Sequence, residues 1–170
     1  MSARALFLFI FIWAAVASAE PPIVVIVRHA EKGANGDRDP DLSPAGKVRA
    51  DTLAQMLKDS GIVAIFTTEF KRTVETAAPT ARALGVNATV IPSDDQQQLV
   101  DKLRALKGNA LVVGHGNTIP NVLKALGIET PIDFPESDYS ELFVVTLADK
   151  PELLRLHYPR DFNCLSTPGG

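Results

Sequence analysis

The chain has 170 residues, of which 46% are hydrophobic and 6% aromatic, so it can bury a core of its own and is not intrinsically disordered. A formal net charge of -3 gives no indication of a nucleic-acid-binding surface. Cys164 is the only cysteine, which excludes an internal disulfide. Because no motif surrounds it, we interpret Cys164 as a free thiol without a catalytic role.

Residues 1–19 have the pattern of a secretory signal peptide. Arg4 supplies a positive charge, residues 5–16 form an apolar run, and residues 17–19 fit a small-residue cleavage site. We therefore predict a secreted or periplasmic protein whose mature chain begins at Glu20. An uncleaved membrane anchor is the alternative, but the apolar run is short for a span, so we expect no stable anchor after cleavage.

Short apolar runs alternate with helical patterns from residue 23 onward. The first run contains only Val and Ile, which is typical of a strand buried on both faces of a parallel sheet. Strands are predicted at residues 23–27, 62–67, 88–91, 110–113, 142–147 and 153–158. Helices are predicted over about residues 44–59, 71–84, 99–107 and 119–126.

Several single residues mark the boundaries of these helices. Ser43 is expected to cap the first helix, with Pro44 at its first position, and Gly85 to end the second. Pro79 is expected to bend or interrupt that second helix. The alternation predicts an α/β fold, an open, mostly parallel sheet with helices on both faces, as a single domain over residues 20–170. The last two strands should form a hairpin at the sheet edge.

Charged and polar groups follow three of the predicted strands. Arg28 and His29 follow the first, Arg72 begins the helix after the second, and His115 follows the fourth between two glycines. Parallel strands bring these ends to one edge of the sheet, where α/β proteins bind ligands. Two guanidinium groups suit phosphate oxygens, a nearby helix N-terminus attracts an anion, and a neutral histidine can attack phosphorus. The pattern predicts a phosphoryl-binding site.

The sequence resembles the histidine phosphatase superfamily, which has the phosphoglycerate mutase-like fold. The resemblance lies in four blocks in family order, namely residues 27–32, residues 42–46 with Arg49-Ala50, residues 72–77 and residues 112–118. It implies that His29 is the nucleophile that becomes a phosphohistidine and that Arg28 and Arg72 bind the phosphoryl group. It implies that His115 binds that group and stabilises its charge in transit, without metal or cofactor.

The resemblance also implies an acidic residue near the phosphate pocket, at a position that varies between branches of the family. Asp94 and Asp95, after the third strand, are the nearest match. Glu31, two residues after the nucleophile, and Glu69, before the second helix, are rivals. Some small members of the family have no obvious acid, so the sequence leaves open that none of these serves.

Other polar residues near the blocks have both a structural and a functional interpretation. Asn117 could cap the helix that follows or reach the pocket. Lys32 and Asn35 lie in a polar loop, where a solvated position is favoured over substrate contact. His157 is interpreted as a surface or packed histidine of the last strand. A zinc site made from all three histidines is disfavoured, because the arginines would repel the cation.

These observations predict an exported phosphatase of the histidine acid phosphatase type. Neutral His29 would attack a phosphomonoester, and water would then hydrolyse the phosphohistidine; a backbone carbonyl should hold the proton on the other ring nitrogen. The alternatives are a phosphomutase of the same fold and a noncatalytic phospholigand-binding protein. The expected partner is a small phosphorylated substrate, whose identity the sequence does not reveal, and the oligomeric state is equally unspecified.

Overall fold

The computed structural model describes residues 20–34, 36–133 and 135–161. The predicted signal peptide, Asn35 and Cys164 lie outside these residues. Within the described part of the chain, no helix combines the length and the hydrophobicity that crossing a membrane requires.

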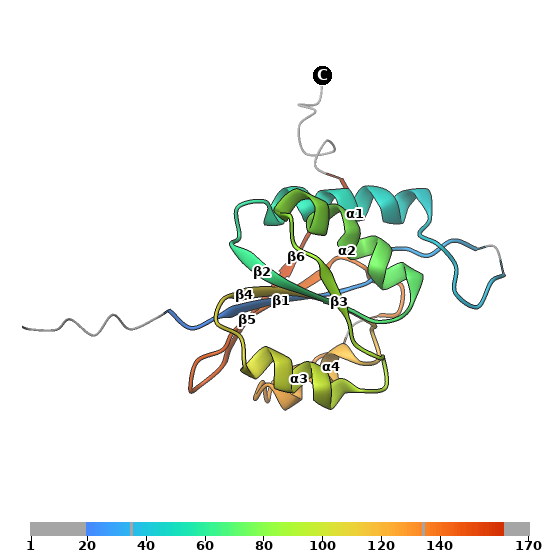
Figure 1. Cartoon of the computed structure of the whole chain (residues 1–170). Coiled ribbons are helices and arrows are strands. Elements are labelled where there is room, and N and C mark those ends of the chain that lie inside the picture. The colour runs from blue at the N-terminus through green and yellow to red at the C-terminus, as the bar shows by residue number, and fades with distance from the viewer. Residues whose placement is uncertain (1–19, 35, 134, 162–170) are drawn as a thin grey trace, which may run out of the picture.

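Among the described residues, six strands form one mixed sheet, whose arrangement can be followed in Figure 1. The strands are β1 (Ile23–Arg28), β2 (Ile62–Thr67), β3 (Ala88–Val90), β4 (Asn109–Gly114), β5 (Glu141–Thr146) and β6 (Glu152–His157). Their order is β3-β2-β4-β1-β5-β6. The pairs β1–β4, β2–β4 and β2–β3 are parallel, whereas β5 runs antiparallel to both β1 and β6. The open, mostly parallel sheet is therefore confirmed, with the predicted hairpin at one edge.

In the part of the chain that the structure describes, four helices cover the two faces of this sheet. They are α1 (Pro44–Leu57), α2 (Lys71–Leu84), α3 (Gln96–Arg104) and α4 (Ile119–Ala125). In Figure 1, α1 and α2 lie over one face and α3 and α4 over the other. The buried residues of β1 alternate between the two cores, with Val24 and Ile26 toward α3 and α4, and Val25 and Val27 toward α1 and α2. The run of β-branched residues is thus buried on both sides.

The helix ends follow local chemistry. The Ser43 hydroxyl accepts the Gly46 N–H, and Gly85 ends α2 with a φ of 66°, a left-handed conformation suited to glycine. Helix α3 begins earlier than predicted, because the Asp95 carboxylate caps it by accepting the Gln98 N–H.

Of the two expectations for Pro79, the interruption of α2 is wrong, since the helix runs unbroken from Lys71 to Leu84. A bend at Pro79 stays a prediction. A proline removes one N–H donor from the helix, and this local cost is outweighed by tertiary packing. The face of α2 that carries Thr76, Ala77 and Thr80 is buried, and α2 packs along α1.

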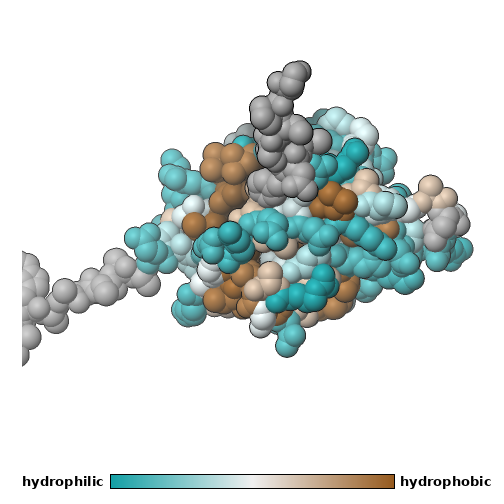
Figure 2. Space-filling view, turned by 90° about the horizontal axis from the view of Figure 1, so that it is seen from above, coloured by the Kyte–Doolittle hydropathy of each residue, from teal (hydrophilic) through white to brown (hydrophobic). Residues whose placement is uncertain are grey.

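The surface seen from the side of α1 and α2 has a mixed character. Figure 2 shows hydrophilic residues over much of this face, with hydrophobic residues in separate groups. Scattered apolar residues of this kind are ordinary on a protein surface.

Candidate active site

The strand β1 places Arg28 and His29 at the carboxyl edge of the sheet. Arg28 is the last residue of β1, and the His29 N–H donates to the Gly114 carbonyl at the end of β4, with a distance of 2.9 Å. This backbone bond continues the pairing of β1 with β4 past the strand ends. His29 and His115 are thereby held side by side, with ring centroids 5.4 Å apart.

The His29 ring is held in one protonation form. Its Nδ1 lies 2.8 Å from the Ala30 carbonyl oxygen, which can only accept, so Nδ1 carries the proton and Nε2 has a free lone pair. Burial lowers the pKa of His29 to about 3, and the positive charges of Arg28 and Arg72 act in the same direction. The His29 ring is therefore neutral at physiological pH, with Nε2 unprotonated.

Arg28 is buried against a loop that the sequence did not connect with the site. The carbonyl oxygens of Glu136 and Asp138 accept hydrogen bonds from its Nη1, the latter at 3.2 Å, and its guanidinium lies 4.3 Å from the centre of the Tyr139 ring. The Tyr139 ring also lies 6.0 Å from the His29 ring. The feature that could have revealed this loop is the pairing of β5 with β1. Because β5 runs antiparallel to β1, it begins beside the end of β1, and the loop that precedes β5 therefore reaches the site.

Arg72 stands in the first turn of α2, between an aromatic ring and a carboxylate. Its guanidinium carbon lies 4.2 Å from the centre of the Phe70 ring, and its Nη1 lies 3.6 Å from Asp39 Oδ1. The Asp39 carboxylate also accepts the Lys71 N–H, at 3.1 Å and 3.2 Å from its two oxygens. Asp39 thus caps the helix N-terminus and orients the guanidinium.

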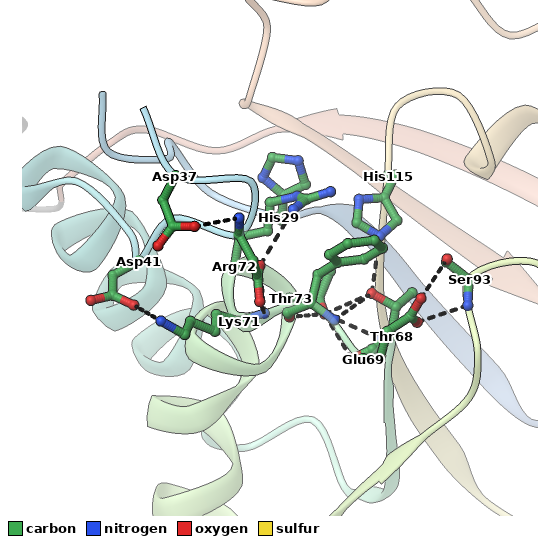
Figure 3. Close-up of polar contacts among 12 residues, drawn as sticks. His29, Asp37, Asp41, Thr68, Glu69, Lys71, Arg72, Thr73, Ser93 and His115 are labelled. Carbon is green, nitrogen blue, oxygen red and sulfur yellow. Dashed lines mark hydrogen bonds and ion pairs between the residues drawn. The ribbon is translucent and has the colours of Figure 1, made fainter. Parts of the chain in front are cut away.

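His115 follows β4 and is buried. Its Nε2 lies 2.9 Å from the Thr68 hydroxyl, and its ring packs edge-on against Phe70 at a centroid distance of 5.3 Å (Figure 3). Burial and, to a smaller extent, the charges of Arg72 and Arg28 lower the pKa of His115 to about 4, against the opposing effect of Glu69.

These side chains enclose two adjoining hollows. The first, of about 230 Å³, is lined by Arg28, His29, Lys32, Arg72, His115, Gly116, Asn117 and Glu136. The second, of about 310 Å³, is lined by Phe70, Arg72, Ser93, Asp94, His115, Asn117 and Thr118. Arg72, His115 and Asn117 belong to both. The four residues singled out from the sequence therefore converge on the first hollow, and the second extends from it.

The acidic candidates are separated by the tertiary structure. Asp94 lines the second hollow and is exposed, whereas Asp95 caps α3. The Glu69 carboxylate accepts the Ser93 N–H at 2.9 Å and the Ser93 hydroxyl at 2.8 Å. Burial raises the pKa of Glu69, but these bonds outweigh it and hold the pKa below its usual range. Ionised Glu69 is thus a hydrogen-bond acceptor.

Glu31 points into a different environment. Its carboxylate accepts hydrogen bonds from Arg49 Nε at 3.0 Å and Arg49 Nη2 at 2.9 Å, and it lines neither hollow. Burial raises the pKa of Glu31, but the hydrogen bonds and charge of Arg49 lower this pKa more. The carboxyl therefore stays ionised. Glu31 therefore anchors α1 to the loop after β1 instead of facing either hollow.

The remaining polar residues also have defined positions. Asn117 lines both hollows and does not cap α4, whose N-cap residue is Thr118. Lys32 lines the first hollow. His157 lies on β6 with its side chain 61% exposed, so the three histidines do not form one cluster.

One group of possible metal ligands occurs among the described residues. Asp138, Glu141 and His157 have ligand atoms within 4.8 Å of one another, but none of these residues lines the two hollows. The Glu141 carboxylate is already bound by the Arg155 guanidinium, with Oε2 2.7 Å from Arg155 Nε. Glu141 therefore already has a cationic partner, and Asp138 and His157 are each hydrogen-bonded to Ser140.

The model of the histidine phosphatase superfamily (branch 1) matches residues 24–95, a segment that contains Arg28, His29 and Arg72. No curated protein sequence matches the chain. His115 lies beyond the matched segment, and the fold alone brings it to the same hollow.

Solved structures share the fold over most of both chains. The protein histidine phosphatase SixA in complex with tungstate is 22% identical with a TM-score of 0.67, over 79% of this chain and 96% of that chain. A candidate phosphohistidine phosphatase SixA from Agrobacterium tumefaciens is 24% identical with a TM-score of 0.64, over 81% and 99%. A mycobacterial glucosyl-3-phosphoglycerate phosphatase is 14% identical with a TM-score of 0.60, over 81% and 98%. The family model thus matches the segment that carries three of the four residues that the sequence predicted at the first hollow, and the fold of these structures extends over most of the chain.

Proposed function

We propose that the protein is a phosphatase that hydrolyses a phosphomonoester through a phosphohistidine on His29. The observation that carries this proposal is the state of His29: its Nδ1 proton is held by the Ala30 carbonyl, so Nε2 offers its lone pair to the hollow that Arg28 and Arg72 line. Two guanidinium groups bind the phosphoryl oxygens, and the buried histidine attacks phosphorus.

The reaction has two steps. In the first, a bond forms between His29 Nε2 and phosphorus while the bond from phosphorus to the leaving oxygen breaks, and that oxygen takes up a proton. In the second, water attacks phosphorus, the N–P bond breaks, and inorganic phosphate leaves with His29 neutral again. Arg28, Arg72 and His115 stabilise the charge on the transferring group in both steps.

We propose Asp94 as the proton donor to the leaving oxygen. Among the candidate acids, Asp94 is the one that lines the second hollow. It does not cap a helix, and this hollow shares Arg72 and His115 with the first. The second hollow would then receive the leaving group. Its lining of Phe70, Ser93, Asp94 and Asn117 suits a polar leaving group.

We further propose that the protein is exported, on the strength of the signal-peptide pattern in residues 1–19. Related folds act on different phosphorylated molecules, since their names include a protein histidine phosphatase and a glucosyl-3-phosphoglycerate phosphatase. The panel of substrates should therefore contain an aryl phosphate, a sugar phosphate and a phosphohistidine peptide.

The test is acid-quenched or alkali-stabilised trapping of labelled phosphoenzyme together with steady-state turnover. His29→Ala should abolish both the labelled phosphohistidine and turnover, and Arg72→Ala should cost a few kcal/mol of transition-state binding, about a hundredfold or more in kcat/KM. His157→Ala, which removes an exposed histidine outside both hollows, is the matched control. Full phosphatase activity in His29→Ala would refute the mechanism. Phosphate binding without a labelled intermediate would instead indicate a noncatalytic phospholigand-binding protein.

The acid is tested with leaving groups of different basicity. Asp94→Asn should slow an alkyl phosphate far more than p-nitrophenyl phosphate, because a good leaving group needs no proton. Asp95→Asn is the control, since asparagine caps a helix as well as aspartate. Equal effects of Asp94→Asn on both substrates would exclude Asp94 as the acid and leave the nucleophile assignment intact.

A further inference from the structure

A closed hydrogen-bond network lies behind His115. The Thr68 hydroxyl, directly after β2, lies 2.9 Å from His115 Nε2 and 3.0 Å from the Thr73 hydroxyl of α2 (Figure 3). The Phe70 N–H points at the same Thr68 oxygen from 3.4 Å, and Thr73 is fully buried. No part of this network was anticipated from the sequence. The network determines which ring nitrogen of His115 carries the proton.

The position of each hydroxyl proton follows from counting donors. The Thr73 oxygen lies 2.8 Å from the Phe70 carbonyl oxygen and 3.1 Å from the Thr68 carbonyl oxygen, both of which can only accept, and it receives the Thr68 N–H at 3.2 Å. The single hydroxyl proton of Thr73 is therefore directed at these carbonyls. The contact between the two hydroxyls must then be donated by Thr68. Both hydroxyls now have their one proton assigned.

This assignment determines the form of His115. With its proton directed at Thr73, the Thr68 oxygen offers only a lone pair to His115, so Nε2 must carry a proton. Figure 3 shows the other ring nitrogen, Nδ1, on the side of the ring toward His29, where the phosphoryl group binds. Because burial and the charge of Arg72 hold the pKa of His115 near 4, Nδ1 is unprotonated in the free protein.

A bare lone pair facing a phosphoryl dianion is repulsive, so binding requires a proton on Nδ1. We propose that Thr68 is a positioning residue that keeps His115 in its Nε2–H form, and that a phosphoryl dianion consequently binds together with one proton, taken up by His115 Nδ1. The proton comes from water, or from the phosphoryl monoanion when that is the species that binds. It turns His115 into an imidazolium that donates to a phosphoryl oxygen and is released when phosphate leaves. The inference rests on the proposed function only for the place of the phosphoryl group.

The experiment is calorimetric titration of the whole protein with tungstate, a dianion at pH 7.5, in buffers of different ionisation enthalpy. The parent protein should take up about one proton for each tungstate bound. Thr68→Val should lose most of this uptake, because a neutral Nδ1–H form becomes available once Nε2 faces a methyl group. It should also bind tungstate roughly tenfold more weakly, since a hydrogen bond to a charged group is lost. Thr68→Ser should restore both properties.

Thr80→Val is the matched control, because Thr80 is a buried threonine of α2 whose hydroxyl has no hydrogen-bond partner. Nitrogen-15 spectra of labelled histidine identify the form of the ring directly. His115 should show protonated Nε2 and bare Nδ1 when free, and two protonated nitrogens with tungstate bound; His29→Ala should retain this change.

The outcomes separate this inference from the proposed function. Binding of tungstate without proton uptake, bare Nε2 in free His115, or undiminished uptake in Thr68→Val would each overturn it, even in an active phosphatase. Proton uptake by His115 in a protein without turnover would support it and refute the proposed function. A protein that did not bind tungstate at all would contradict both.

Discussion

Replacing Glu31 by glutamine should destabilise the protein and leave its chemistry intact. The Glu31 carboxylate receives two hydrogen bonds from Arg49, at 2.9 Å and 3.0 Å, and the Arg49 side chain is 8% exposed. Glutamine keeps the size of the side chain but removes the negative charge. It also turns one acceptor oxygen into an amide nitrogen that faces the guanidinium, so that the buried cation loses its counter-ion.

The magnitude follows from the exposure of the pair. Removing one partner of a fully buried ion pair costs about 3–5 kcal/mol. The Glu31 side chain is 17% exposed, and the remaining oxygen of glutamine still accepts one hydrogen bond. We therefore expect a loss of roughly 2–3 kcal/mol in the free energy of unfolding. A domain with a stability of about 5–15 kcal/mol would remain folded and testable.

The assay combines urea denaturation at pH 7.5 with turnover of an alkyl phosphate under folded conditions. Glu152→Gln, which changes an exposed glutamate of β6, is the control. The difference between Glu31→Gln and the parent should shrink as the pH falls below about 4.5, because the parent carboxyl has a lowered pKa and its stabilisation is lost on protonation. A variant with unchanged stability and a turnover reduced by about a hundredfold would show instead that Glu31 donates the proton.

Three further predictions concern the stability of the fold and the role of Asp39 beside the Arg72 guanidinium. Folding lowers the pKa of His29 to about 3 and that of His115 to about 4. The free energy of unfolding should therefore fall as the pH drops from about 6.5, by roughly 2 kcal/mol for each histidine at pH 5. Replacing both histidines by asparagine should remove this pH dependence in urea denaturation. Gly46→Ala should destabilise by at least about 3 kcal/mol, although alanine favours a helix, because its Cβ would overlap the Glu31 carbonyl oxygen; a rise in Tm would contradict this. Asp39→Ala should cost about 1 kcal/mol through the lost helix cap and raise KM more than it lowers kcat, and an unchanged KM would refute its role at the guanidinium.

Local patterns in the chain were sufficient for most of the fold. The run of β-branched residues before Arg28 predicted a strand buried on both faces, and the Ser43-Pro44 pair predicted the start of α1; both are present. These features depend on side-chain spacing and on backbone groups within a few residues, which a sequence displays directly. Pro79 shows where such reasoning ends, since packing of α2 along α1 keeps the helix intact despite the local cost.

The sequence by itself predicted which residues meet at the first hollow, because Arg28, His29, Arg72 and His115 follow parallel strands and the ends of such strands share one edge. Only the tertiary structure decided what surrounds them. The antiparallel course of β5 brings Tyr139 against Arg28, and the pairing of Glu31 with Arg49 keeps away from the hollow a carboxylate that lies only two residues from His29. The contact of Thr68 with His115 spans 47 residues. Such contacts depend on the direction of side chains brought together across the sheet, and no periodicity along the chain encodes that direction.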